Sequence, residues 1–460
     1  MDKDKEFLGT EKIGKLLFRL AVPTVIAQIV NMLYNIVDRI YIGHIPGEGS
    51  AALTGVGVCM PIIMIISAFA ALVSAGGAPR ASISLGKGDK DGAEKILGSC
   101  FLLQLILSVM LTAVLLIWNR KLLLMFGASE NTIDYAAAYM DIYAVGTIFV
   151  QLTLGLNAFI TAQGFAKTGM LTVIIGAAAN IVLDPLFIFV FDMGVRGAAV
   201  ATVISQGVSC VWAVCFLLSK KTGLKIRLKN MRLSLKIIMP CIALGLATFI
   251  MQASESVISV CFNSSLLKYG GDIAVGAMTI LTSVMQFALL PLQGIGQGAQ
   301  PIMSYNYGAR NPEDRVKKTY RLLLIVNMIY AVILWAAIML FPKAFAGIFS
   351  SDSELVGFAA KALRIYLGGM FLMGAQIACQ MAFVSIGNAP CSIIVAVVRK
   401  FVLLIPLIYI MPHIISDKAI GVYTAEPIAD VLAVTFTLIL FAFRFRSAMK
   451  KLEKPEAAEK

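Results

Sequence analysis

The chain has 460 residues, of which 59% are hydrophobic and only 14% are charged. Its mean hydropathy of +0.86 excludes a soluble globular protein and indicates a chain that crosses a membrane many times. The formal net charge of +13 would suit a nucleic-acid partner, but the Lys and Arg residues cluster at alternate breaks between apolar runs. This pattern predicts a multi-pass membrane protein with both termini in the cytoplasm and no nucleic-acid partner.

The apolar runs divide the chain into twelve predicted spans. Each run is about 20 to 27 residues long, enough to cross a hydrocarbon core of ~30 Å at 1.5 Å per residue. In the first half the spans lie near residues 16–43, 51–75, 94–118, 133–159, 169–191 and 196–218. We expect a cytoplasmic N-terminal segment (1–15), an N-terminal lobe (16–218), a basic cytoplasmic linker (219–234), a C-terminal lobe (235–443) and a cytoplasmic tail (444–460).

The second half of the chain repeats the plan of the first half. Pro23 and Asp38 stand fifteen residues apart in the first span, as do Pro240 and Glu255 in the seventh. Further pairs recur at nearly constant offsets: Gly86 and Gly308 (222), Gly164 and Gly387 (223), and Gly197 and Gly421 (224). A copy with six spans starts and ends on one side of the membrane, so the two copies should be related by an axis along the membrane normal. The sequence therefore predicts an all-α membrane protein of twelve transmembrane helices, in two six-helix bundles related by pseudo-two-fold symmetry about that normal.

Polar side chains in three spans of the first half form a candidate cation site. Asn180 and Asp184 are four residues apart and share one helix face. A carboxylate in the middle of a bilayer costs about 2.5 to 3.5 kcal/mol, so Asp184 should face protein or water and have a partner. By residue counting, Asp38, Asp184 and Thr202 lie roughly 7 to 11 Å below the outer boundary, with Asn180 one turn deeper. Such oxygen-rich side chains suit Na⁺, and two neighbouring anions also favour uptake of a proton.

A purely structural interpretation of these aspartates is also available. Asp38 could pair with neighbouring Arg39, and Asp184 could mark the end of a helix ahead of Pro185. Adjacent residues on a helix point about 100° apart, which disfavours the first alternative. The apolar run LFIFVF that follows Pro185 disfavours the second. We therefore favour a cation site over structural pairing.

The charged residues of the second half support two different hypotheses. Glu255 is the only carboxylate of the seventh span and occupies the repeat position of Asp38, which favours a functional role over a structural pair. Arg399, Lys400 and Asp430 lie near the middles of the last two spans and are expected to neutralise one another as a structural salt bridge.

The chain resembles multidrug and toxic compound extrusion (MATE) transporters, in particular their bacterial MepA-like and DinF-like members. The resemblance rests on PTVIAQIVNMLYNIVDRIYIG in the first span, GLNAFITAQG in the fourth, NIVLD in the fifth, GAAVAT in the sixth and GVYTAEPIAD in the last. It implies a two-lobed exporter in the bacterial cell membrane that exchanges Na⁺ or H⁺ for small organic cations by alternating access. It also implies a monomer that is not an enzyme and has no cofactor besides the coupling ion.

The resemblance also assigns roles to particular residues. The family's N-terminal cation site falls on the four residues that depth selects: Asp38, Asn180, Asp184 and Thr202. The expected substrate contacts are Asn31, Tyr34, Tyr139, Asn157 and Glu255. Some members place a second cation site in the C-terminal lobe, with a Glu in helix 7 and an Asp in helix 10. Glu255 fits the first, but the tenth span carries Gln376 and Gln380 and no carboxylate, so a complete second site is not expected.

Two other functions compete with this interpretation. A lipid-linked saccharide flippase of the same broad superfamily would need a cationic cavity for pyrophosphate, whereas the first lobe carries acidic residues. An intramembrane aspartyl hydrolase could use two buried aspartates as an acid and base pair, but hydrolysis does not require a two-fold repeat. We therefore favour the exporter.

Overall fold

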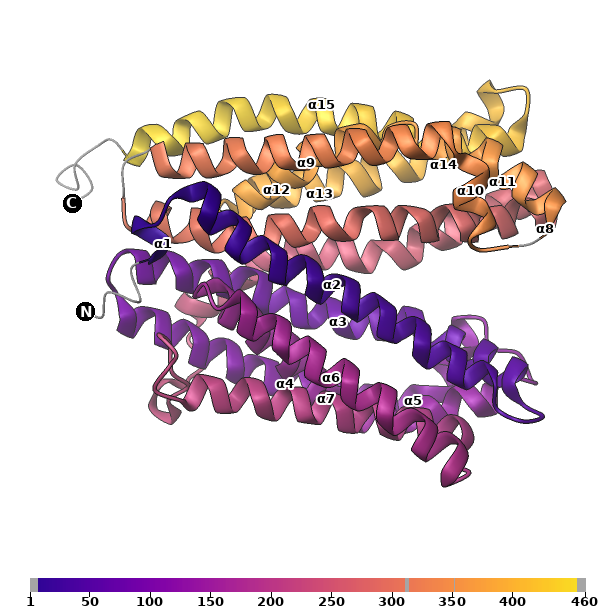
Figure 1. The fold of residues 1–460 in the computed structure, drawn as a ribbon, viewed down its shortest axis with the longest axis horizontal. Coiled ribbons are helices and arrows are strands. Elements are labelled where there is room, and N and C mark those ends of the chain that lie inside the picture. Colours follow the sequence, from indigo (N-terminus) through magenta and orange to yellow (C-terminus); the bar gives the residue numbers. More distant parts are fainter. Residues whose placement is uncertain (1–6, 311–313, 351, 453–460) are drawn as a thin grey trace.

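The computed structural model describes residues 7–310, 314–350 and 352–452, and within them the chain is almost entirely helical (Figure 1). Ten helices of this described part are long and apolar enough to span a membrane, and one bent helix pair counts as an eleventh span. The twelfth comes from α8, whose 74 residues are interrupted at Gly271, where φ is 63° and ψ is −161°. Glycine adopts such a conformation without a Cβ clash, so the chain reverses there between two spans. The prediction of twelve spans is confirmed.

The N-terminal half consists of α1 (Phe7–Thr10), α2 (Ile13–Gly43), α3 (Gly49–Gly86), α4 (Lys90–Met125), α5 (Ile133–Ala162), α6 (Ala166–Pro185), the π-helix η2 (Leu186–Val190) and α7 (Gly194–Leu218). A short 3₁₀ turn, η3 (Leu228–Asn230), lies in the linker. The C-terminal half consists of α8 (Leu235–Gly308), α9 (Asp314–Leu340), α10 (Pro342–Gly347), α11 (Ser353–Tyr366), η4 (Met370–Leu372), α12 (Met373–Ser385), α13 (Ala389–Val397), the π-helix η5 (Val398–Leu404), α14 (Ile405–Ile414) and α15 (Lys418–Leu452).

These helices form two lobes, α2 to α7 and α8 to α15 (Figure 1). Each lobe has its own apolar core, with Tyr139 and Met140 in the N-terminal core and Phe262 and Tyr423 in the C-terminal core. The described part of the chain therefore has the predicted arrangement of two helical bundles.

The two lobes touch closely at the end of the molecule where α1 begins and α15 ends (Figure 1). A Cβ atom on Gly76 of α3 would overlap the carbonyl oxygen of Cys241 in α8, and one on Gly86 would overlap that of Tyr305. The hydroxyl of Thr24 in α2 also donates a hydrogen bond to the carbonyl oxygen of Gly294 in α8, at 2.6 Å. Small residues thus let the backbones of the two lobes approach at this end, and the lobes diverge toward the other end in Figure 1.

The short helix α1 bridges the two lobes at the same end. Leu8 is buried in an apolar cluster with residues of α8, α12 and α15 of the C-terminal lobe, and the ring of Phe7 lies against Gly164 at the end of α5. The carbonyl oxygen of Leu8 accepts hydrogen bonds from Asn306 at 2.9 Å and from the guanidinium of Arg315 at 3.2 Å. The N-terminal segment therefore ties the closed end together.

Candidate functional site

The helix that carries Asn180 and Asp184 does not end at Asp184. After Pro185 the chain continues as the five-residue π-helix η2 up to Val190. Proline lacks the backbone N–H of a regular helix, and a widened π turn accommodates that loss. Asp184 thus lies inside a continuous helical path, next to a local irregularity of the kind often found at functional sites.

Asp38, Asn180 and Asp184 meet in the interior of the N-terminal lobe. Their exposed fractions are 9%, 1% and 0%. The Asn180 amide donates a hydrogen bond to Asp184 Oδ1 at 3.1 Å, and the carboxyl groups of Asp38 and Asp184 lie within hydrogen-bonding reach of each other. One oxygen of each residue, Asp38 Oδ1, Asn180 Oδ1 and Asp184 Oδ2, is buried without a hydrogen-bond partner among the described residues. Three buried oxygens in this state are suited to a small hard cation.

Neither aspartate is neutralised by a neighbouring basic side chain. Among the ion pairs of the described residues none joins Asp38 to Arg39, and the side chain of Arg39 is exposed. Two buried carboxyl groups in contact favour binding of one cation, a proton or a metal ion, because both cannot stay charged cheaply in a low-dielectric interior.

A small cavity of about 50 Å³ adjoins this acidic pair. It is lined by four of the predicted residues, Asn31, Tyr34, Asn180 and Thr202, from α2, α6 and α7. The hydroxyl of buried Tyr139 on α5 lies against Thr202. The structure therefore brings together seven of the predicted residues: Asp38, Asn180, Asp184, Thr202, Asn31, Tyr34 and Tyr139.

Sequence reasoning missed several polar residues of this cavity. Thr153 of α5 and Ser205, Gln206 and Ser209 of α7 also line it. The sequence could have identified two of them, because Gln206 and Ser209 follow Thr202 by four and seven residues and so share its helix face.

Asn157 lies outside this cavity. It is half-buried on α5, its Oδ1 faces Gly169 in the first turn of α6, and that oxygen has no hydrogen-bond partner in the described chain. A role for Asn157 in substrate contact stays a prediction.

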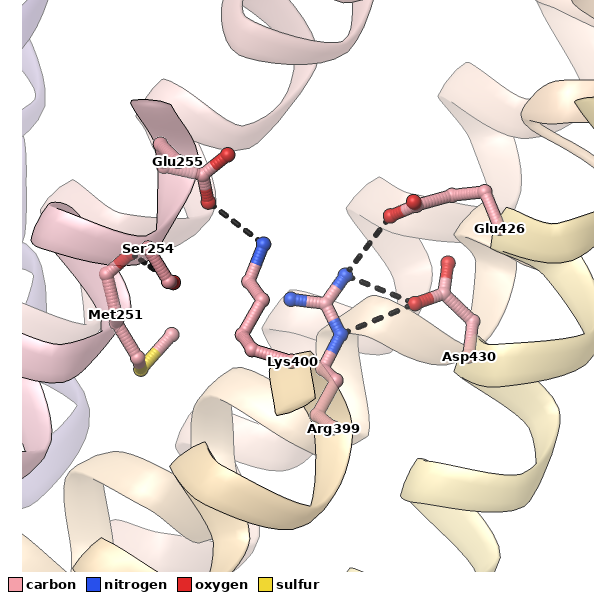
Figure 2. Close-up of polar contacts among 7 residues, drawn as sticks. All are labelled: Met251, Ser254, Glu255, Arg399, Lys400, Glu426 and Asp430. Carbon is pink, nitrogen blue, oxygen red and sulfur yellow. Dashed lines mark hydrogen bonds and ion pairs between the residues drawn. The ribbon is translucent and has the colours of Figure 1, made fainter. Parts of the chain in front are cut away.

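The C-terminal lobe holds a network of five charged residues from α8, η5 and α15 (Figure 2). Lys400 Nζ donates to Glu255 Oε1 at 2.6 Å. Arg399 donates to Asp430 Oδ1 through Nη2 at 2.8 Å and Nε at 3.1 Å, and to Glu426 Oε1 at 3.3 Å. The expected pairing of Arg399 with Asp430 is confirmed, whereas Lys400 pairs with Glu255 instead of Asp430.

Glu255 was predicted to have a functional role without a basic partner, but it forms an ion pair with Lys400. Its side chain is 53% exposed, while that of Lys400 is only 5% exposed. The carboxylate thus borders open space and is held from the protein side by the lysine. Glu426 was not predicted, although it follows Gly421 by five residues as Thr202 follows Gly197, so the internal repeat could have identified it.

Intramembrane aspartyl hydrolases, the enzyme alternative considered above, carry a Gly-x-Gly-Asp motif, and such a run occurs here at residues 86–89. It forms the turn between α3 and α4, far along the chain from the buried aspartates. Asp89 Oδ1 accepts a hydrogen bond from the backbone N–H of Gly92 at 2.8 Å and so caps α4. This run has a structural explanation.

Two six-helix lobes with a polar, uncompensated site buried inside one of them are the architecture of a membrane transporter. The MatE family model matches residues 23–186 and 247–410, two segments 224 residues apart. This spacing agrees with the offsets of the internal repeat. The chain belongs to the MATE family, whose proteins are transporters and not enzymes.

Known proteins similar to this chain agree with that assignment. "Multidrug export protein MepA" of Staphylococcus saprophyticus is 24% identical over 453 residues, covering 98% of this chain and 99% of that protein. The MepA protein of Staphylococcus aureus strain NCTC 8325 is 22% identical over 447 residues, covering 96% and 97%. Among solved structures, "Crystal structure of MATE in the bent conformation" has a TM-score of 0.91 at 26% identity, covering 99% of this chain and 100% of that one. "Outward-facing conformation of a multidrug resistance MATE family transporter of the MOP superfamily" has a TM-score of 0.90 at 26% identity, with the same coverage.

Proposed function

We propose that this protein is a secondary active multidrug efflux transporter of the bacterial cell membrane, which exports organic cations in exchange for Na⁺ or H⁺. The names of the MepA relatives support multidrug export. The observation that carries the proposal for ion coupling is the buried contact between Asp38 and Asp184, with three oxygens that lack hydrogen-bond partners in the described chain.

In the proposed mechanism the coupling ion and the drug prefer different conformations. The contacts between the lobes lie at the end that holds α1 and the end of α15. From the distribution of basic residues we infer that this end faces the cytoplasm. An external cation would then enter the pocket of Asp38 and Asp184, neutralise it and favour release of the drug to the outside. Coupling requires only this difference in preference. Each charge that moves inward through the full membrane potential supplies about 2.3 kcal/mol per 100 mV.

The side chains around the acidic pair support recognition of organic cations. Tyr34 lines the adjoining cavity and offers an aromatic face, which attracts cations, and Asn31 offers an amide in the same lining. Tyr139 is buried and stacks on Tyr143. In the other lobe the exposed carboxylate of Glu255 would attract a cationic substrate, while Lys400 moderates that attraction.

Transport into or out of proteoliposomes tests the proposal directly. Efflux of ethidium would be measured with purified protein under an imposed Na⁺ gradient or an imposed pH gradient, each alone. We expect one gradient to drive efflux and Asp184→Asn to abolish that dependence. Asp272→Asn, an exposed aspartate beside the break in α8, is the matched control and should transport like the wild type. Unchanged ion-driven efflux in Asp184→Asn would refute the proposal.

The flippase alternative is less well supported by the C-terminal lobe. Its buried cations Arg399 and Lys400 are both paired with carboxylates, so they do not offer a free cationic surface for pyrophosphate. Absence of ethidium transport under both gradients, together with binding of a lipid-linked pyrophosphate, would favour the flippase.

A further inference from the structure

The N-terminal lobe contains a second and larger polar cavity, of about 520 Å³, between the end of α4 and the starts of α5 and α7. Its polar lining consists of Asn119, Arg120, Asp134, Asp141 and Arg196. None of these residues belongs to the Asp38 and Asp184 site or its small cavity. The cavity therefore needs an explanation of its own.

Charges of both signs line this cavity without cancelling completely. Arg120 and Asp134 form an ion pair at 2.6 Å and are both largely exposed. Arg196 and Asp141 border the same space, yet neither takes part in an ion pair among the residues that the structure describes. An unpaired cation and an unpaired anion across one cavity are complementary to a zwitterion.

A buried amide holds the anionic side of the cavity in place. Asn119 is only 6% exposed, and its Nδ2 donates to Asp141 Oδ1 at 2.5 Å and to the carbonyl oxygen of Ala137 at 3.2 Å. The Oδ1 of Asn119 is buried without a hydrogen-bond partner in the described chain. A ligand group with several N–H donors would satisfy this oxygen together with Asp141, because a buried acceptor without a hydrogen bond is destabilising.

The position of the cavity along α4 places it at the level of lipid headgroups. Asn119 and Arg120 directly follow Trp118, a residue type enriched at membrane interfaces. On the apolar side, Leu116 and Ile117 also line the cavity and are 47% and 69% exposed, as expected for side chains that face acyl chains. The cavity thus combines a polar interior with an apolar lip that faces the bilayer.

We propose that this cavity binds the phosphoethanolamine headgroup of a membrane phospholipid. The guanidinium of Arg196 would bind the phosphate, because its planar N–H groups match the spacing of two phosphate oxygens. Asp141 and the free oxygen of Asn119 would accept hydrogen bonds from the primary ammonium group. A choline headgroup has no N–H to donate, and a glycerol headgroup has no positive charge, so both should bind more weakly.

The proposed site is also connected to the interior of the lobe. Asp141 follows Tyr139 by two residues on α5, and Arg196 precedes Thr202 by six residues on α7. A headgroup held between Asp141 and Arg196 would therefore fix the relative position of the two helices that border the acidic pair. The lipid site itself does not depend on the transport proposal, since its binding can be measured without transport.

The test is a lipid-binding measurement on the purified full-length protein in detergent. Binding of dihexanoyl phosphatidylethanolamine would be measured by calorimetry beside its phosphatidylcholine and phosphatidylglycerol counterparts. We expect the ethanolamine lipid to bind at least about tenfold more tightly than either, which corresponds to 1.4 kcal/mol. Equal binding of the three lipids to the wild-type protein would overturn the proposal without reference to any variant.

Variants then locate the site. Asp141→Asn and Arg196→Gln should each weaken binding of the ethanolamine lipid by about tenfold or more. Lys121→Gln, which removes an exposed positive charge next to the cavity, and Asp272→Asn should leave binding unchanged. Equal loss in the controls, or unchanged binding in both cavity variants, would overturn the assignment. Binding of free phosphoethanolamine is measured as well. If it binds as tightly as the lipid, the cavity is a site for a soluble zwitterion instead.

Discussion

Replacing Arg399 by Met should destabilise the C-terminal lobe more than any other single change in its charged network. The guanidinium makes hydrogen bonds at 2.8 and 3.1 Å to Asp430 and at 3.3 Å to Glu426. The exposed fractions of these three residues are 5%, 1% and 2%. Methionine would fill much of the volume but leave two buried carboxylates without their counter-charge. Removing one partner of a buried ion pair costs about 3 to 5 kcal/mol.

The expected loss can be measured by thermal unfolding of the purified protein, followed by tryptophan fluorescence. For a unit of about 200 residues, 1 kcal/mol corresponds to roughly 2 to 4 °C, so Arg399→Met should lower the Tm by roughly 6 to 20 °C. Glu426→Gln is the control, because Asp430 still neutralises the arginine at the shorter distances, and its effect should be several times smaller. A Tm of Arg399→Met within about 2 °C of the wild type would show that the network does not stabilise the lobe.

Three further changes probe the closed end of the molecule. The thiols of Cys100 and Cys241 lie in contact across the two lobes. In a variant that keeps only these two cysteines, an oxidant should cross-link them and stop efflux, and reduction should restore it. Continued efflux by fully cross-linked protein would contradict alternating movement at this end. Gly76→Val should lower the free energy of unfolding by at least about 1 to 3 kcal/mol through overpacking. Gly57→Val on the same helix, with open space around it, should not. Equal Tm values for the two variants would contradict the close approach of the lobes. Arg315→Gln removes the charged donor that binds two carbonyl oxygens of the N-terminal segment. A cysteine introduced at the closed end should then react faster with a thiol-specific label. Unchanged labelling would show that this segment does not hold the lobes together.

The N-terminal site was largely predictable because it depends on two one-dimensional quantities. Helical periodicity puts Asn180 and Asp184 on one face, and residue counting puts Asp38 at a similar depth. Both remain valid once the helices pack, and the structure brings the three residues into contact. The family resemblance named Asn157, which shares a face of α5 with Thr153. Thr153 lines the cavity and Asn157, about 6 Å further along the helix, does not. At this position the predicted helix face was right and the predicted depth was wrong.

The charged network of the C-terminal lobe was only partly predictable, for a related reason. Arg399 and Lys400 are adjacent in sequence and lie in the π-helical segment η5, where the number of residues per turn differs from that of an α-helix. Their side chains therefore diverge toward different helices, Arg399 toward α15 and Lys400 toward Glu255 on α8 (Figure 2). The prediction rested on the depth of these residues within their spans, and depth does not say toward which neighbouring helix a side chain points, so it gave Lys400 the wrong partner.

The two lobes share a fold but treat the carboxylates at corresponding positions of the repeat, Asp38 and Glu255, in opposite ways. In the N-terminal lobe Asp38 and Asp184 contact each other, and no ion pair of the described chain neutralises them. In the C-terminal lobe Glu255 is neutralised by the covalently attached ammonium of Lys400. A fixed cation cannot leave, and separating it from its partner inside the protein costs several kcal/mol. An exchangeable cation suits only the lobe that lacks such a partner, which is why the proposed coupling belongs to Asp38 and Asp184 and not to both halves of the repeat.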